Sequence, residues 1–141
     1  MADRIYLNEL KNQKLKATPK RLAILKVLSA ATVYLGPQEV WEQLKKDFKK
    51  LGLPTVYRNL EELVDAGLVS RIIHPNRRLY YFLCENHQHH HHFICVQCGK
   101  VQDIGFCAQD QLQKEVAHLH GGKILSHTLQ VNGLCRSCLN S

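Results

Sequence analysis

Two Cys-x-x-Cys pairs limit the fold of this chain most strongly, because they require distant segments to meet. The pairs are Cys95/Cys98 and Cys135/Cys138, the second of them near the end of the 141 residues. Each pair presents two thiolates from one tight turn, and two such turns complete the four-thiolate tetrahedron that structural zinc favours. Two independent redox pairs are the alternative. We expect Zn²⁺ to tie the C-terminal tail to the segment around Cys95 and to contribute to folding.

Five histidines lie within residues 87–92, directly before the first cysteine pair. Successive side chains of a strand point to opposite faces, so His90 and His92 would lie on one face and His89 and His91 on the other. One ribbon can then supply ligands to two separate sites, and imidazole suits several transition metals. A solvated polar run is the alternative.

The net charge of +7 is confined to the N-terminal half. Residues 1–78 contain 15 Lys and Arg against 8 Asp and Glu, whereas residues 79–141 contain four of each kind. A basic half suggests a polyanionic partner, and nucleic acid is the first candidate, although a solvated surface would have the same charge. The sequence shows neither an apolar run that could span a membrane nor a secretion signal, so we expect a cytoplasmic protein without a membrane partner.

The periodicity predicts two domains. Thr18-Pro19 and Gly36-Pro37 each open a helix, the second with an apolar face that runs to Phe48. A third helix begins at Leu53-Pro54 and leaves Thr55, Tyr57, Arg58, Asn59 and Glu62 outermost, and strands follow over residues 68–73 and 79–83. This order is that of a winged helix-turn-helix. The second half predicts strands over 93–96, 101–104 and 124–131 and a helix over 108–120. The fold class is α+β, with a winged helix-turn-helix DNA-binding domain (residues 1–83) and a C-terminal α/β domain (residues 84–141).

Four motifs are distributed over nearly the whole chain: TPKR from Thr18, TVYRNL from Thr55, HHHHFICVQCGK from His89 and GLCRSC from Gly133. Together they resemble the ferric uptake regulator (Fur) family of metal-sensing repressors. The resemblance implies a homodimer whose C-terminal halves dimerise and whose winged helices bind an AT-rich palindromic DNA operator. It also implies the residues that bind DNA: Tyr57 on bases, Arg58 on the backbone, and Thr55, Asn59, Arg21, Lys14 and Lys16 in support. Arg77, beside the wing turn, is a further candidate.

The resemblance also implies a regulatory metal site that joins the two domains. His90, His92 and Asp103 match three expected ligands, whereas Tyr34 stands where the family often has a histidine. Cys84 resembles the thiolate ligand of the zinc-uptake branch (Zur), and His74 would be the ligand from the wing. A soft thiolate favours zinc over Fe²⁺ or Mn²⁺, although Cys84 could instead be a small buried residue with Glu85 as the ligand.

A further candidate site joins His89, His91, Asp110 and His127, whose family counterparts bind metal in several members. A satisfied core histidine is the alternative for His127.

The function that these features favour is a repressor of metal-uptake genes that binds its operator when zinc fills the sensor site. Sensing of ferrous iron or peroxide is the alternative within the family. A zinc enzyme is disfavoured, because the chain lacks His-Glu-x-x-His and the deaminase pairing of His-x-Glu with Pro-Cys-x-x-Cys. An enzyme would also give no reason for the basic half. A metal store or chaperone is a third class that the histidines allow, and DNA binding that depends on stoichiometric metal would discriminate against it.

Overall fold

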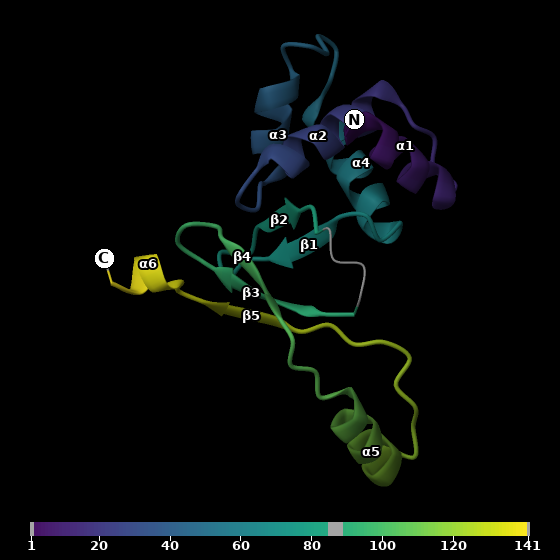
Figure 1. Cartoon of the computed structure of the whole chain (residues 1–141), viewed down its shortest axis with the longest axis vertical. Coiled ribbons are helices and arrows are strands. Elements are labelled where there is room, and N and C mark those ends of the chain that lie inside the picture. The colour runs from purple at the N-terminus through teal and green to yellow at the C-terminus, as the bar shows by residue number, and fades with distance from the viewer. Residues whose placement is uncertain (1, 85–88, 141) are drawn as a thin grey trace.

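The structure, a computed structural model, describes residues 2–84 and 89–140. Helices dominate the N-terminal half and strands the C-terminal half (Figure 1). In chain order the elements are α1 (Ala2–Asn12), α2 (Pro19–Ala30), α3 (Pro37–Leu44), α4 (Leu53–Asp65), β1 (Ser70–Ile73), β2 (Leu79–Phe82), β3 (His91–Cys95), β4 (Val101–Ile104), α5 (Gln109–His120), β5 (Gln130–Gly133) and α6 (Arg136–Leu139).

Helices α1–α4 pack around one hydrophobic core. The beginning of α2 follows the predicted signal, since the Thr18 hydroxyl accepts a hydrogen bond from the Arg21 N–H at 3.2 Å and Pro19 fills the first helical position. The core residues repeat at helical spacing, so each helix buries one face. Fully buried members include Leu10, Ile24, Leu25, Val40, Val56, Leu60 and Leu63.

The hairpin of β1 and β2 is the wing. The strands are antiparallel, with Ser70 opposite Phe82 and Ile73 opposite Leu79. An isolated bridge between Leu35 and Tyr81 joins the segment before α3 to the hairpin. The predicted architecture, an N-terminal winged helix-turn-helix followed by an α/β domain, is therefore confirmed.

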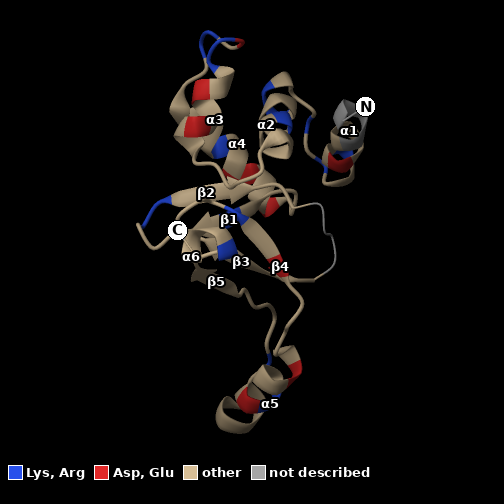
Figure 2. Cartoon of the chain, turned by 60° about the vertical axis from the view of Figure 1, so that its left-hand side comes forward, with Lys and Arg blue, Asp and Glu red and all other residues tan. Residues whose placement is uncertain are grey.

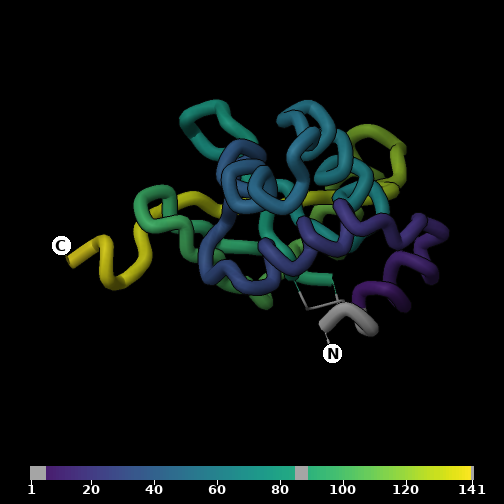
Figure 3. The backbone as a smooth tube through the Cα atoms, turned by 90° about the horizontal axis from the view of Figure 1, so that it is seen from above, coloured from purple at the N-terminus to yellow at the C-terminus, as the bar shows by residue number. Residues whose placement is uncertain are grey.

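The C-terminal sheet has the strand order β4-β3-β5. β3 pairs with β4 in antiparallel fashion and with β5 in parallel, which places Gly133 opposite Cys95 and brings the C-terminal tail beside the first Cys-x-x-Cys turn. Helix α5 lies at the far end of two long connections (Figure 1). Seen from above, the N-terminal helices lie over the strands, and the segment that contains α6 extends beyond them (Figure 3).

Three details differ from the sequence predictions. The strand predicted over residues 124–131 is wrong: only Gln130–Gly133 is a strand, because the preceding residues run past the start of β3 and have no partner strand within the described residues. Helix α3, whose apolar face was predicted to run to Phe48, ends at Leu44, and Phe48 packs against the core from the turns that follow. Helix α1 was not predicted, although Tyr6 and Leu10, one turn apart, are both buried.

Within the described residues, no helix is long and apolar enough to cross a bilayer.

Candidate metal centres and nucleic-acid interface

Among the described residues, three groups of His, Cys and Asp side chains converge so that their ligand atoms lie within 4.8 Å of one another. A tetrahedral zinc site has edges of about 3.3 Å between two nitrogens and about 3.8 Å between two sulfurs, given its usual bond lengths. The groups are Cys95, Cys98, Cys135 and Cys138; Cys84, His90, His92 and Asp103; and His89, His91, Cys107 and His127.

The four-cysteine group unites the two Cys-x-x-Cys turns. Cys95 ends β3, Cys135 precedes α6, and the Sγ atoms of Cys98 and Cys135 lie 3.7 Å apart, the spacing of a zinc tetrahedron edge. The N–H of Cys98 lowers the pKa of the Cys95 thiol, and the N–H of Cys138 lowers that of Cys135. These amides favour the thiolate forms that bind metal, and none of the six cysteines, all of them among the described residues, is in a disulfide.

The second group, here called the sensor group, spans the connection between the two halves. Cys84 follows β2, His92 lies on β3, and the register places Asp103 of β4 directly opposite His92. The His90 Nε2 lies 3.0 Å from the Cys84 Sγ and 2.9 Å from the His92 Nε2. The Asp103 Oδ1 lies 3.7 Å from His90 and 3.6 Å from His92.

One thiolate, two imidazoles and one carboxylate therefore face a common point in the sensor group. Burial lowers the pKa of His92, which keeps this imidazole neutral and able to bind metal at neutral pH. Glu85, the predicted alternative to Cys84, lies outside the described residues.

The third group contains three of the four predicted residues together with Cys107. The His127 Nε2 lies 3.2 Å from His89, 3.0 Å from His91 and 3.3 Å from the Cys107 Sγ. Asp110, the predicted fourth ligand, is exposed in the first turn of α5 and does not belong to this group. Cys107 had no predicted role, and its place in the loop between β4 and α5 gave no periodic signal.

The alternation predicted for the histidine run places its members in two groups. His90 and His92 belong to the sensor group, and His89 and His91 to the third group. The 2.0-residue period of an extended chain explains this division.

His74, the ligand expected from the wing, is not a member of the sensor group in this arrangement. Its Nδ1 accepts a hydrogen bond from the Asn76 N–H at 3.0 Å, so the proton belongs on Nε2. The Nε2–H then donates to the Val96 carbonyl oxygen at 3.0 Å. Both ring nitrogens therefore take part in hydrogen bonds in this arrangement.

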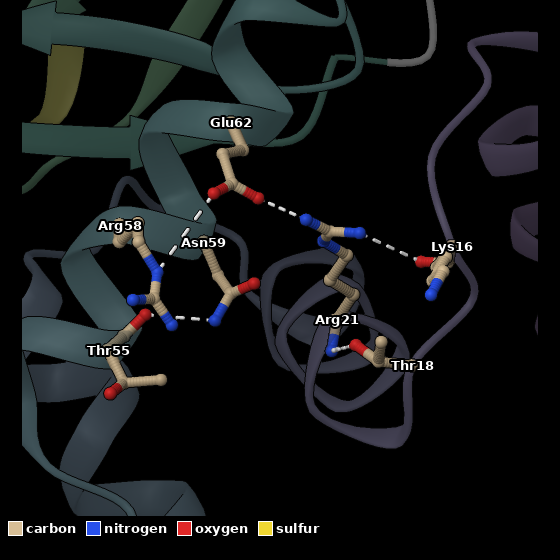
Figure 4. A network of polar contacts seen from close by, with 7 residues as sticks. All are labelled: Lys16, Thr18, Arg21, Thr55, Arg58, Asn59 and Glu62. Carbon is tan, nitrogen blue, oxygen red and sulfur yellow. Dashed lines mark hydrogen bonds and ion pairs between the residues drawn. The ribbon is translucent and has the colours of Figure 1, made fainter.

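Part of the predicted DNA-binding set lies where the start of α2 faces α4, namely Lys16, Arg21, Thr55, Arg58 and Asn59 (Figure 4). Tyr57 is exposed, and the Arg58 side chain is 70% exposed, which suits contact with a phosphate. Asn59 is an exception: it is 7% exposed and donates to the Thr55 carbonyl oxygen at 2.9 Å. The prediction that Asn59 lies outermost is wrong, because its amide can bond the preceding turn of its own helix.

The Arg21 side chain also makes its hydrogen bonds within the protein. Its guanidinium donates to Glu62 and, at 3.1 Å, to the Lys16 carbonyl oxygen, so it holds α2 against α4 (Figure 4). Lys14, Lys16 and Arg77 are exposed, and Arg77 has a positive φ of 72° in the wing turn. Figure 2 shows Lys and Arg on the N-terminal helices, in the loop after α3 and at the wing turn.

Comparison with known proteins agrees with this architecture. The chain is 37% identical to a ferric uptake regulation protein of Yersinia pestis over 91% of this chain and 86% of that protein. It is 30% identical to a peroxide-responsive repressor of Staphylococcus saprophyticus over 94% of this chain and 88% of that protein. A solved zinc uptake regulator complexed with zinc and DNA has the same fold, with a TM-score of 0.79 and 22% identity over 98% of this chain and 93% of that chain. The model of the ferric uptake regulator family matches residues 12–132, and the chain belongs to this family.

Proposed function

We propose that this chain is a zinc-responsive repressor that binds an AT-rich palindromic operator as a homodimer and controls metal-uptake genes in the cytoplasm. Family membership already makes it a metal-dependent transcriptional regulator, a class distinct from enzymes. The observation that carries the zinc assignment is the convergence of Cys84 with His90, His92 and Asp103.

The thiolate favours zinc over the harder ions. Fe²⁺ and Mn²⁺ prefer nitrogen and oxygen ligands, whereas a cysteine thiolate in a four-ligand group suits Zn²⁺. The nitrogen–sulfur and nitrogen–nitrogen distances around His90, 3.0 and 2.9 Å, are shorter than the zinc tetrahedron edges of about 3.6 and 3.3 Å, so these ligands are close enough to share one ion. An ion held there would supply the positive charge that lets a thiolate, a carboxylate and two imidazoles remain close together.

The sensor group suits a switch because of its place in the chain. Cys84 follows the last strand of the wing, and His90 lies just before β3 of the C-terminal sheet. When these ligands converge, they close the connection between residues 1–83 and residues 84–141. The orientation of the winged helix relative to the sheet is then fixed, and metal binding and operator binding favour the same arrangement.

Helix α4 and the wing would contact the operator. Tyr57 and Thr55 would face base edges, while Arg58, Lys14, Lys16 and Arg77 would contact phosphates. Arg21 and Asn59 would act indirectly, since their polar atoms hold α2 and α4 in place.

The homodimer would cover the apolar residues of the C-terminal half. No residue of α5 is buried within the described part of the chain, and its neighbourhood exposes large apolar side chains. A second copy of the chain would bury these side chains, as the interface of a symmetric homodimer does. Its members include Phe106, Leu119, Leu125, Leu129 and Val131.

We further assign Zn²⁺ as the structural ion of the four-cysteine group. A third ion would be held by His89, His91, Cys107 and His127, a set whose nitrogen–nitrogen and nitrogen–sulfur distances of 3.0–3.4 Å also fit a tetrahedron.

The test is operator binding by metal-depleted protein titrated with Zn²⁺ or anaerobic Fe²⁺, with metal counted per chain. Wild type should bind a fluorescent AT-rich palindromic duplex on addition of low Zn²⁺. Cys84→Ser should lose this response and keep the four-cysteine zinc, whereas the matched control Cys107→Ser should retain a response. A normal zinc response in Cys84→Ser would remove the main support for the zinc assignment, and a response to Fe²⁺ alone would move the protein to the iron- or peroxide-sensing branch.

A further inference from the structure

A small aromatic cluster of the N-terminal half rests against the first Cys-x-x-Cys turn. The rings of Tyr34 and Tyr80 lie 4.7 Å apart, and those of His74 and Tyr80 lie 5.4 Å apart. Tyr34 is buried in a second, smaller core together with Ile72 of the wing and Ile94 of β3. This core belongs to both halves of the chain and is separate from the core of the helices.

Three hydrogen bonds cross from this cluster to the turn. The Tyr34 N–H donates to the Gly99 carbonyl oxygen at 3.0 Å, and the Tyr34 hydroxyl donates to the Cys95 carbonyl oxygen at 3.1 Å. The His74 Nε2–H donates to the Val96 carbonyl oxygen at 3.0 Å. The three acceptors belong to the loop that presents the Cys95 and Cys98 thiolates.

Gly99 is required for this close approach. Its φ is +87°, and a Cβ built there would lie 3.0 Å from the Cβ of Val33. The turn therefore presents bare backbone to the segment around Tyr34, which explains why three of its carbonyl groups are within reach of donors.

A separate contact fixes the other side of the wing. The Gln130 side-chain amide accepts from the Ile73 N–H at 3.1 Å and donates to the Ile73 carbonyl oxygen at 2.8 Å. It thereby replaces a strand partner at the edge of β1 and joins the wing to β5.

We infer that the first Cys-x-x-Cys turn supports the DNA-binding half, and that Tyr34 and His74 are positioning residues that hold the winged helix against this turn. The inference rests on the proposed function, since it concerns the orientation in which the operator is bound. In this arrangement the structural zinc fixes the shape of a loop that both halves share. His74 serves DNA binding through the Val96 carbonyl group instead of through the sensor metal.

The test uses full-length protein with both kinds of metal site filled with Zn²⁺. Tyr34→Phe removes one hydroxyl and keeps the ring, and His74→Phe removes both hydrogen bonds of the imidazole. Tyr80→Phe is the matched control, because its hydroxyl contacts only Asn76 among the partners described and does not cross to the turn. Three quantities are measured: hydrogen exchange of peptides that cover residues 31–36 and 95–100, zinc per chain, and operator affinity.

In Tyr34→Phe and His74→Phe we expect faster exchange in these peptides and operator binding weakened about two- to tenfold, the range for the one hydrogen bond to the turn that each variant loses. Zinc per chain and dimer mass should remain those of wild type, and Tyr80→Phe should match wild type throughout. Unchanged exchange, or faster exchange with unchanged operator affinity, would overturn the positioning role. Loss of one zinc from His74→Phe would also overturn it, since His74 would then be a ligand. If wild type binds no operator with any metal, the proposed function is wrong and so is the role of these residues in DNA binding. The hydrogen-exchange comparison would still test whether Tyr34 and His74 hold the turn.

Discussion

The fourth member of the third group is Cys107, where the sequence predicted Asp110. This difference gives a prediction with a clear magnitude. The Cys107 Sγ lies 3.4 Å from the His89 Nε2 and 3.3 Å from the His127 Nε2, close to the nitrogen–sulfur edge of about 3.6 Å in a zinc tetrahedron. Cys107→Ser retains the shape but offers a hydroxyl that stays protonated at neutral pH. The site then has three imidazole ligands and no anionic ligand.

Loss of an outer-shell partner alone usually costs 10- to 100-fold in metal affinity. Loss of a direct thiolate ligand should therefore weaken this site by at least about 100-fold, or about 2.7 kcal/mol. Asp110→Asn should leave the affinity unchanged, because Asp110 is exposed in the first turn of α5 and outside the group. The two variants differ from wild type by one or two atoms, so neither should disturb packing.

Cobalt substitution measures this effect directly. Co²⁺ bound to a thiolate absorbs in the near ultraviolet, and the intensity rises with each thiolate ligand. Wild type and the two variants are each titrated with Co²⁺. The absorbance due to one thiolate should be missing from Cys107→Ser only, and competition with a chelator gives the metal affinities. If Asp110→Asn weakens the site and Cys107→Ser does not, the assignment from the structure is refuted and the ligand set predicted from the sequence is restored.

Three other variants test separate parts of the molecule. Tyr57→Ala should weaken operator binding about tenfold, measured by fluorescence anisotropy, with the dimer mass unchanged by gel filtration. Cys95→Ser should release one zinc per chain and lower the thermal unfolding midpoint, because metal binding contributes to folding. Glu61→Gln should destabilise the protein to urea by about 1 kcal/mol at pH 7, since it weakens the hydrogen bonds from Arg71 and Tyr81 that join α4 to the wing. The hydrogen bond from Arg71, and then that from Tyr81, holds the pKa of Glu61 below its ordinary value. This difference in stability should therefore persist above pH about 4.3 and disappear as pH falls through the lowered pKa.

Local signals in the sequence predicted most of the fold correctly. Thr18 and Pro19 begin α2 as expected, and the period of two in the histidine run divides its members between two groups. These features depend on neighbours one to four residues away, which a sequence states directly. The strand predicted over residues 124–131 failed for the opposite reason, since alternation does not provide a partner strand, and β3 begins too late to pair with it.

Asn59 shows the limit of helical periodicity for a polar residue. Its position on α4 predicts exposure, yet the side chain turns back to the Thr55 carbonyl group and is buried against the core. A residue that can bond its own backbone has an alternative to solvent, and only tertiary packing decides between them.

The ligand sets illustrate the same limit in another form. Ligands on one strand, such as His90 and His92, are fixed by the alternation of that strand, whereas a ligand from elsewhere depends on where its loop passes. Cys107 and Asp110 are three residues apart, but the first lies in the loop beside His127 and the second has already entered α5. His74 is a suitable ligand by type and lies in the wing as expected, yet its two ring nitrogens are used by Asn76 and Val96. The residue type therefore predicts which side chains could bind a metal. Their positions and the hydrogen bonds that they already make decide which of them are available as ligands.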